Sequence, residues 1–273
     1  MDVMSTIAIR GRRIGKVATL DGRPGLRREL LSMDYVLPVV RAGSRRAVLE
    51  LATRSPSAAG TLHFGRQSFS VDRVAYFGIF LERWYRADYH DAVVVDVGAH
   101  KGFYGAHALL EGAAEVHSYE PEAENAALLS RTAETFGRSW IVHRAAVGAA
   151  SGTARLLVSA ESAGHSIVTA QTEGARRTLW TETVDVVAMT DVLEDAFRPD
   201  SRLIVKIDAE GAECDIVLGT PVSAWRNVHL VFLEMHDFAP CSTSAILAHL
   251  AEAGLDVDQH ELDDGAELIR LAR

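Results

Sequence analysis

The chain has 273 residues, of which 48% are hydrophobic and 24% are charged. This balance is typical of a soluble globular protein with one large domain, or with one domain and a smaller appendage. The sequence contains no apolar run near the roughly 18 residues that a membrane helix needs, and its N-terminus lacks the uninterrupted apolar stretch of a secretory signal. We therefore expect a cytoplasmic protein that does not contact a membrane.

Charge is distributed unevenly along the chain, whose formal net charge is −9. Residues 1–60 contain 11 Arg and Lys against five Asp and Glu, whereas the remaining residues contain 17 against 32. An acidic main body argues against a long footprint on a phosphate backbone, so nucleic acid is a poor substrate. We expect the basic segment to fold back on the acidic body or on a sister subunit, which would make the protein a homo-oligomer; an anionic ligand is the alternative.

The N-terminal part of the chain has no regular pattern. We predict an N-terminal extension over residues 1–75, with helices over 26–33 and 36–52, that serves as a lid or an oligomerisation segment. A catalytic domain would then cover residues 76–273. Aromatic residues recur at helical spacing over 76–85, which predicts a helix packed on the core or, alternatively, an aromatic wall facing a ligand.

From residue 91 onward strands and helices alternate. The apolar, β-branched runs predict strands over 93–95, 116–119, 140–143, 154–158, 182–187, 203–207 and 228–233, with closing strands over 255–257 and 268–271. Helical patterns cover 103–111, 122–136, 191–196, 213–218 and 243–253. This alternation predicts an α/β fold with a doubly wound, mostly parallel sheet that has helices on both faces.

The two cysteines, Cys214 and Cys241, are not part of a CxxC or CxxH motif. A structural zinc site built on them is therefore not expected, and we predict that both are free thiols.

The loop after the first buried strand has the sequence DVGAHKG and runs from Asp96 to Gly102. Glycines at such a strand-to-helix turn let a ligand approach the backbone closely. The spacing between Gly98 and Gly102 differs from the Gly-x-Gly-x-x-Gly pattern of pyrophosphate sites, and Asp96 would repel phosphates. An acid here suits S-adenosylmethionine, which carries an amino group and a sulfonium but no phosphate. The alternative is an ordinary tight turn.

Glu120 ends the next strand, 24 residues after Asp96. In nucleotide-binding α/β folds a carboxylate at this place accepts hydrogen bonds from ribose hydroxyls. The alternative is that Glu120 offsets the dipole of the helix that follows it.

Charged residues interrupt or follow two later apolar strands. Lys206 lies inside the strand over 203–207, where a lysine is costly unless it is paired, and Asp208 follows that strand. Glu234 and His236 follow the strand over 228–233. If the strands are neighbours, their ends lie about 5 Å apart, so Asp208, Glu234 and His236 would converge. The alternative is a buried salt bridge of Lys206, with His236 merely exposed.

Between residues 93 and 236 the chain resembles the FkbM-type methyltransferases. The resemblance is carried by the segments VVVDVGAHKG, YEPEAENAALL, HRAAVGAASGTARL, SRLIVKIDAEGAECDIVLG and LVFLEMH, of which KIDAEGAE is the most specific to the family. It implies a seven-stranded sheet of the class I, Rossmann-like methyltransferase type. It also implies O-methylation of small molecules, such as sugars or natural products of secondary metabolism. The family usually has Asn at the position of His100.

The resemblance also implies roles for individual residues. The cofactor loop would comprise Asp96, Gly98, Ala99 and Gly102. Glu120 would be the ribose acid, Ala146 would border the adenine, and Asp208 would lie where the amino-acid end of the cofactor meets the acceptor.

We therefore predict an S-adenosylmethionine-dependent O-methyltransferase acting on a hydroxyl of a small molecule. His236 is the predicted catalytic base, since its ordinary pKa is near neutral, and Asp208 and Lys206 complete the catalytic set. We assign no metal, although Mg²⁺ held by Asp208 and Glu234 is an alternative. Two other functions remain open: a nicotinamide-dependent oxidoreductase on a related fold, and a non-catalytic scaffold that binds the cofactor.

Overall fold

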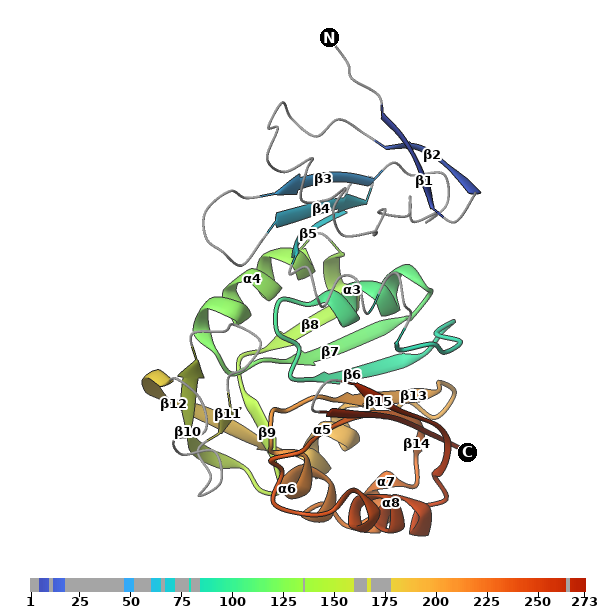
Figure 1. Cartoon of the computed structure of the whole chain (residues 1–273). Helices are drawn as coiled ribbons and strands as arrows, with labels where there is room; N and C mark the ends of the chain where they lie inside the picture. Colours follow the sequence, from blue (N-terminus) through green and yellow to red (C-terminus); the bar gives the residue numbers. More distant parts are fainter. Residues whose placement is uncertain are drawn as a thin grey trace.

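The computed structural model describes five N-terminal strands, residue 79, and residues 84–134, 136–159, 166–167, 178–263 and 266–273. The five strands are β1 (Ser5–Ile9), β2 (Arg12–Val17), β3 (Ala47–Leu51), β4 (Gly60–Phe64) and β5 (Gln67–Val71). β1 pairs with β2, and β3, β4 and β5 form a separate antiparallel sheet (Figure 1).

The predicted helix over 36–52 is wrong where it meets β3. Residues 47–51 pair with β4 in the register Leu49 to Leu62, and such pairing between strands can override a local helical pattern. The rest of that predicted helix and the one over 26–33 lie outside the described residues. So does most of the predicted helix over 76–85, of which only Ile79, Trp84 and Tyr85 are described.

A seven-stranded sheet forms the centre of the described chain between residues 93 and 272 (Figure 1). Its strands, in spatial order, are β15 (Asp256–Asp263), β16 (Ala266–Ala272), β14 (Val228–His236), β13 (Leu203–Ile207), β6 (Val93–Val97), β7 (Glu115–Tyr119) and β8 (Trp140–His143). β16 runs antiparallel to both its neighbours, and the other pairs within the sheet are parallel. The predicted doubly wound, mostly parallel sheet is confirmed.

Helices cover both faces of this sheet (Figure 1). One face carries α3 (Phe103–Leu110) and α4 (Ala123–Glu134), and the other carries α5 (Met189–Ala196), α6 (Glu213–Leu218), α7 (Val222–Trp225) and α8 (Thr243–Glu252). β6 is buried on both sides: Val93, Val95 and Val97 pack into one core cluster and Val94 into the other. This two-sided burial explains its continuous apolar sequence. None of the described helices has the length and hydropathy to span a membrane.

A second, four-stranded sheet flanks the carboxyl end of β8. It contains β11 (Ser166–Ile167), β10 (Gly152–Ser159), β12 (Thr178–Ala188) and β9 (Ala146–Gly148), in that spatial order. The sequence predicts β10 and β12 as strands but does not separate them from the central sheet, because a strand pattern alone does not reveal its partners. The two short strands β9 and β11 are not predicted.

Cys214 and Cys241 form a disulfide, so the prediction of free thiols is wrong. Cys214 lies in α6, and Cys241 lies in the turn between β14 and α8. β14 carries the chain back across the sheet, which places this turn against α6. Since the two cysteines are 27 residues apart, no short motif predicts their pairing.

Candidate active site

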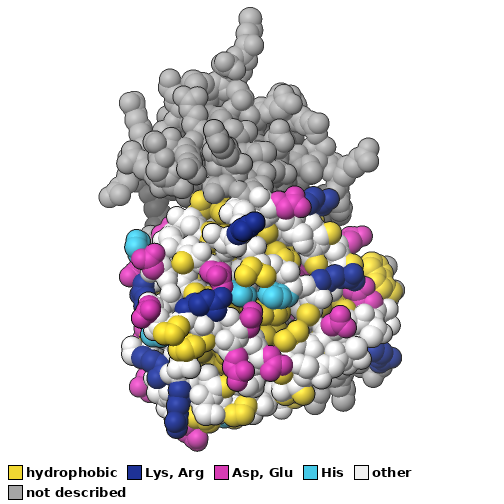
Figure 2. Space-filling model, turned by 180° about the vertical axis from the view of Figure 1, so that it is seen from behind, with side chains coloured by type: hydrophobic (Ala, Val, Ile, Leu, Met, Phe, Trp, Pro, Cys, Tyr) yellow, Lys and Arg dark blue, Asp and Glu magenta, His cyan; other side chains and the backbone are white. Residues whose placement is uncertain are grey.

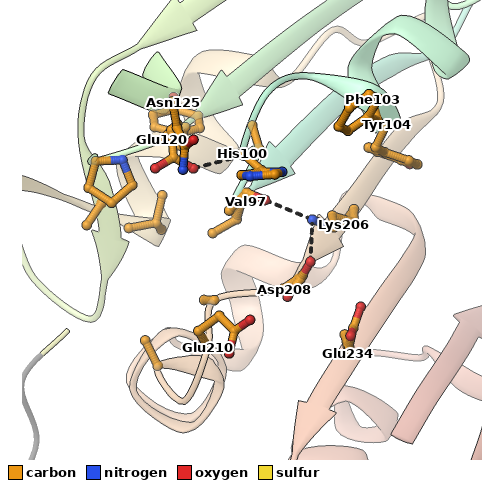
Figure 3. A pocket seen from close by; sticks show the side chains of 18 of the residues that line it. Val97, His100, Phe103, Tyr104, Glu120, Asn125, Lys206, Asp208, Glu210 and Glu234 are labelled. Atoms are coloured by element: carbon orange, nitrogen blue, oxygen red, sulfur yellow. Dashed lines mark hydrogen bonds and ion pairs between the residues drawn. The ribbon is translucent and has the colours of Figure 1, made fainter. Parts of the chain in front are cut away.

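A cavity opens at the carboxyl ends of β6, β7, β13 and β14, beside the second sheet (Figure 3). In doubly wound sheets ligands bind at this edge, where the strand order reverses. The lining includes predicted site residues from the segments that follow four strands of the central sheet and from β13 itself, namely Gly98, Ala99, Glu120, Ala146, Lys206 and Asp208. It also includes Glu234, from the end of β14.

Gly98 lies in the loop after β6 and packs against the loop that follows β13. Its φ is +72°, a left-handed conformation that favours glycine. A Cβ at this position would lie 1.7 Å from the carbonyl oxygen of Asp208, and the amide of Asp208 donates to the carbonyl of Val97 at 3.2 Å. The glycine is therefore required by the neighbouring protein loop, in addition to any requirement of a ligand.

Gly102 and Asp96 do not line the cavity. A Cβ on Gly102 would lie 2.6 Å from the Leu129 side chain, so this glycine allows α3 to pack closely on α4. Asp96 is fully buried and accepts a hydrogen bond from the Ser118 hydroxyl at 3.3 Å. The structure thus gives both residues a place in the scaffold beneath the loop, and their contact with the cofactor stays a prediction.

Glu120 lies in the cavity with both carboxylate oxygens engaged by backbone amides. It accepts hydrogen bonds from His100 N at 2.8 Å and from Glu122 N at 2.9 Å. Burial raises the pKa of Glu120 to about 8. The start of α4 is instead served by Glu122, which accepts from the amides of Glu124 and Asn125 at 3.0 and 2.7 Å. Glu120 is therefore not needed to cap α4, which favours the ribose role.

The two ends of the cavity differ in chemistry. Beside Glu120 the walls are largely apolar and come from both sheets: Pro121, Ala146, Val147, Leu156 and Ile167. The opposite end carries the carboxylates of Asp208, Glu210 and Glu234 (Figure 3). An apolar slot with one acid, followed by an acidic end, fits S-adenosylmethionine: the slot would hold the adenosine, and the acids would face the sulfonium and amino group.

Lys206 connects the scaffold to the acidic end. Its ammonium donates to the Gly98 carbonyl and to Asp208 Oδ2, both at 3.0 Å, and lies 3.6 Å from Asp96 Oδ1. Burial alone would lower the pKa of Lys206, but the nearby charges, with Asp208 first, outweigh it and raise the pKa. The buried salt bridge foreseen as the alternative is present, and it lies within the cavity wall.

Glu234 is a titratable group of the cavity that the sequence analysis did not assign a catalytic role. The charge of Asp208, together with burial, raises the pKa of Glu234 to about 7. The Tyr85 hydroxyl donates to Glu234 Oε2 at 3.2 Å. Tyr85 and Trp84 line the cavity, and Tyr85 also packs in the core against Tyr104. For these two residues contact with a ligand stays a prediction.

His236 lies near the carboxylates but does not line the cavity. Its Nδ1 is 2.9 Å from Glu213 Oε1, and its Nε2 is 3.5 Å from Glu210 and 4.0 Å from Glu234. Burial alone would lower the pKa of His236, but the Glu213 hydrogen bond and the neighbouring carboxylates raise it to about 9. A histidine with its pKa raised in this way is a poor proton acceptor at neutral pH, and this, together with its position outside the cavity lining, argues against His236 as the base.

The predicted convergence of Asp208, Glu234 and His236 is present. Their potential ligand atoms lie within 4.8 Å of one another. However, Lys206 already pairs with Asp208, and the protonated ring of His236 faces Glu234. Positive charge is thus supplied to this group by the protein itself, and we assign no metal to it.

Comparison with known families decides between the candidate functions. The family described as Methyltransferase FkbM domain matches residues 96–257, which is more than half of the chain. The chain belongs to the FkbM methyltransferase family. The cofactor of this FkbM methyltransferase is S-adenosylmethionine, and the nicotinamide-dependent and non-catalytic alternatives are set aside. A comparison with curated protein sequences finds no match.

Solved structures of other methyltransferases resemble the chain at low sequence identity. A candidate RNA methyltransferase from Pyrococcus horikoshii has 15% identity and a TM-score of 0.42, over 76% of this chain and 88% of that one. The ribosomal protein L11 methylase of Lactobacillus delbrueckii subsp. bulgaricus has 15% identity and a TM-score of 0.39, over 73% and 77%. A candidate methyltransferase complexed with S-adenosylhomocysteine (SAH) has 9% identity and a TM-score of 0.45, over 81% and 57%.

Proposed function

We propose that this FkbM methyltransferase methylates a hydroxyl group of a small molecule and that Glu234, rather than His236, is the catalytic base. The observation that carries the proposal is a carboxylate facing the cavity whose pKa is raised to about 7. A hydroxyl is a poor nucleophile until its proton leaves, and a base with a pKa near the working pH is best suited to accept that proton.

The residues of the cavity would have different roles in cofactor binding and in proton transfer. When bound, S-adenosylmethionine supplies an activated methyl group on a sulfonium. Glu120 would hold the ribose, and Asp208 would lie beside the positively charged end. Tyr85, by donating to Glu234, fixes the carboxylate so that its other oxygen can accept the acceptor's proton. Most of the rate enhancement would come from positioning the acceptor against the methyl group.

The surroundings of Glu234 support a small acceptor. Trp84, Tyr85, Phe103 and Tyr104 line this part of the cavity, and aromatic faces suit the ring of a sugar or a natural product. The end that would receive the acceptor is acidic, which disfavours a polyanion. On the face shown in Figure 2, the Lys and Arg side chains of the described residues are interspersed with Asp and Glu and form no extended basic surface. A basic surface of that kind is what nucleic-acid binding requires.

The test has two stages. The purified protein is incubated with isotope-labelled S-adenosylmethionine and a lysate of the source organism. The mixture is separated into small-molecule, RNA and protein fractions, and labelled products are identified by mass spectrometry. We expect the label on an oxygen of a small molecule. Label on nitrogen or carbon, or in the RNA or protein fraction, would contradict the proposal.

The second stage compares Glu234→Gln with Glu252→Gln, a matched change of an exposed glutamate in α8. We expect Glu234→Gln to lower kcat by roughly 10²–10⁴-fold, the usual range for a general base, with SAH affinity changed by only a few fold. Glu252→Gln should behave as the wild type. Normal turnover by Glu234→Gln would place the base elsewhere.

A further inference from the structure

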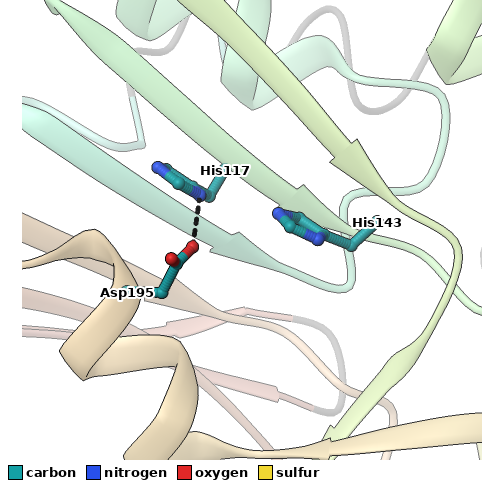
Figure 4. A group of neighbouring side chains, drawn as sticks. All are labelled: His117, His143 and Asp195. Atoms are coloured by element: carbon teal, nitrogen blue, oxygen red, sulfur yellow. Dashed lines mark ion pairs between the residues drawn. The ribbon is translucent and has the colours of Figure 1, made fainter.

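A second cluster of polar side chains lies outside the catalytic cavity (Figure 4). His117 lies on β7, His143 ends β8 and Asp195 lies in the last turn of α5. β7 and β8 are parallel neighbours in the register Tyr119 to His143. His117 is two residues before Tyr119, so both histidines project from the same face of the sheet. α5 covers this face and brings Asp195 to them.

The spacing of this cluster is close to that of a metal site. Asp195 Oδ2 lies 3.5 Å from His117 Nδ1, and one potential ligand atom from each of the three residues lies within 4.8 Å of the others. Ligand atoms around a tetrahedral Zn²⁺, at bond lengths of about 2.0–2.1 Å, are roughly 3.3–3.5 Å apart. The His117–Asp195 pair already has this separation. The His143 ring lies parallel to that of His117 with centroids 5.7 Å apart, so it would have to turn to direct a nitrogen at the same ion.

Two ring nitrogens of the cluster lack hydrogen-bond partners among the described residues. His117 Nδ1 and His143 Nε2 are both buried, and neither has a hydrogen-bond partner within the part of the chain that the structure describes. Leaving a buried polar atom unsatisfied costs about 1–3 kcal/mol. A bound cation would satisfy both nitrogens at once.

Contacts of the second ring nitrogen of His117 favour its role as a metal ligand. Its other ring nitrogen, Nε2, is 2.5 Å from Glu115 Oε1, and the same carboxylate oxygen accepts from Arg198 at 2.7 Å. A proton held on Nε2 by Glu115 leaves the lone pair of Nδ1 directed at Asp195. Metal-binding histidines usually donate their second N–H to a carboxylate in this manner.

We propose that His117, His143 and Asp195 bind a divalent transition-metal ion of the Zn²⁺ type, with Glu115 as the positioning carboxylate. Two imidazoles and one carboxylate are a typical protein ligand set for Zn²⁺, and solvent would occupy the fourth position. His117 is 2% exposed and the side chain of Asp195 is 66% exposed, so the ion has a route of entry. The competing interpretation is an ion pair in which a protonated His117 links Glu115 and Asp195.

The site is separated from the cofactor cavity by one aromatic ring. The Tyr119 ring stacks on His143 with centroids 4.3 Å apart and lines the cavity. The amide of Glu120 donates to the His143 carbonyl at 3.1 Å. A metal that fixes His143 would therefore fix the wall against which the ribose acid is held.

The experiment is a Zn²⁺ titration of the tag-free full chain after removal of metals, followed by calorimetry and repeated with Co²⁺, whose visible absorption reports its coordination. We expect one Zn²⁺ per chain, at least 100-fold weaker binding by His143→Ala and Asp195→Asn, and 10–100-fold weaker binding by Glu115→Gln. Asp200→Asn, a matched change of an exposed aspartate after α5, should bind as the wild type.

Asp195→Asn keeps the test valid if His143→Ala does not fold, because Asp195 is at the surface. The proposal fails if the wild type does not bind Zn²⁺, or if His143→Ala and Asp195→Asn bind as the wild type does. It also fails if Glu234→Gln abolishes binding, because the ion would then occupy the catalytic cluster instead.

Discussion

The buried ammonium of Lys206 offers the sharpest test of the site's electrostatics. Replacing Lys206 with Met keeps an unbranched side chain, one heavy atom shorter, and removes its charge. The carboxylate of Asp96, which is fully buried and 3.6 Å from the ammonium, would lose its compensating cation. Asp208 is less affected, since its side chain is 26% exposed and water can replace part of the lost interaction.

The expected loss of stability follows from this burial. Breaking a buried ion pair by removing one partner typically costs about 3–5 kcal/mol, and we expect Lys206→Met to lower the free energy of unfolding by that amount at pH 7. The double variant Asp96→Asn/Lys206→Met should recover much of the loss, because the only carboxylate then left without Lys206 at its side, Asp208, is partly exposed to water. Arg226→Met, which removes an exposed cation after α7, should change stability by less than about 0.5 kcal/mol.

The pH dependence gives an independent check of the same reasoning. Burial already raises the pKa of Asp96 in the folded protein, and loss of Lys206 would raise it further. A carboxyl whose folded-state pKa exceeds its unfolded value of about 3.9 binds more protons when folded, so stability falls as pH rises through that interval. Lys206→Met should therefore be closer to the wild type at pH 5 than at pH 8.

Urea unfolding followed by circular dichroism measures these differences. If Lys206→Met stays within 1 kcal/mol of the wild type at both pH values, Lys206 does not compensate Asp96. If the double variant is no more stable than Lys206→Met, the loss arises from packing rather than from charge.

Further predictions concern the cofactor, the histidine, the disulfide and the N-terminal segment. Glu120→Ala should weaken SAH binding by about 1–3 kcal/mol, the cost of leaving the buried ribose hydroxyls without a hydrogen-bond partner, measured by calorimetry. The charge of His236, whose pKa is raised to about 9, contributes stability that is fully present below about pH 6.5 and is lost as pH rises through 9. The difference in unfolding free energy between the wild type and His236→Gln should shrink over that interval. Reducing the disulfide, which closes a loop of 27 residues, should lower the free energy of unfolding by about 3–4 kcal/mol. Deleting residues 1–60 should spare SAH binding yet abolish turnover, because this basic segment is proposed to close the acceptor site or to join subunits.

Each of these predictions has a result that would count against it. Unchanged SAH affinity in Glu120→Ala would mean that its carboxylate only holds the amides of His100 and Glu122. A stability difference that grows with pH would show that His236 is neutral in the folded protein. Equal unfolding curves with and without reductant would remove the disulfide as a source of stability. Full turnover by the truncated protein would mean that residues 1–60 are not needed for catalysis.

The apolar strand patterns in the sequence correctly predicted the strands that carry the site. β6 and β13 are short, apolar and β-branched because both of their faces are buried, and that requirement is visible in the residues themselves. The residues that follow these strands, such as Gly98 and Asp208, must lie at one edge of a parallel sheet. Their place in the cavity therefore follows from the order of the strands.

The direction in which each side chain points, and its neighbours in space, could not be predicted from the sequence. Glu234 and His236 both follow the apolar part of β14. Glu234 lines the cavity, whereas His236 pairs with Glu213. His117, His143 and Asp195 come from two strands and a helix, with no spacing that marks them as partners. Such groupings depend on which elements become neighbours, and only the folded chain reveals that.

The contact between Gly98 and the Asp208 carbonyl has a consequence for redesign of the enzyme. Because the two loops touch backbone to backbone, a substitution that shifts residues 208–210 will also displace the cofactor loop. A library aimed at new acceptors through those residues would therefore return variants with altered KM for the methyl donor. Trp84 lines the same cavity from outside these two loops and is only partly buried. Acceptor preference is thus better varied at Trp84 than at Tyr85, which holds Glu234, because a change at Trp84 need not displace the backbone of either loop.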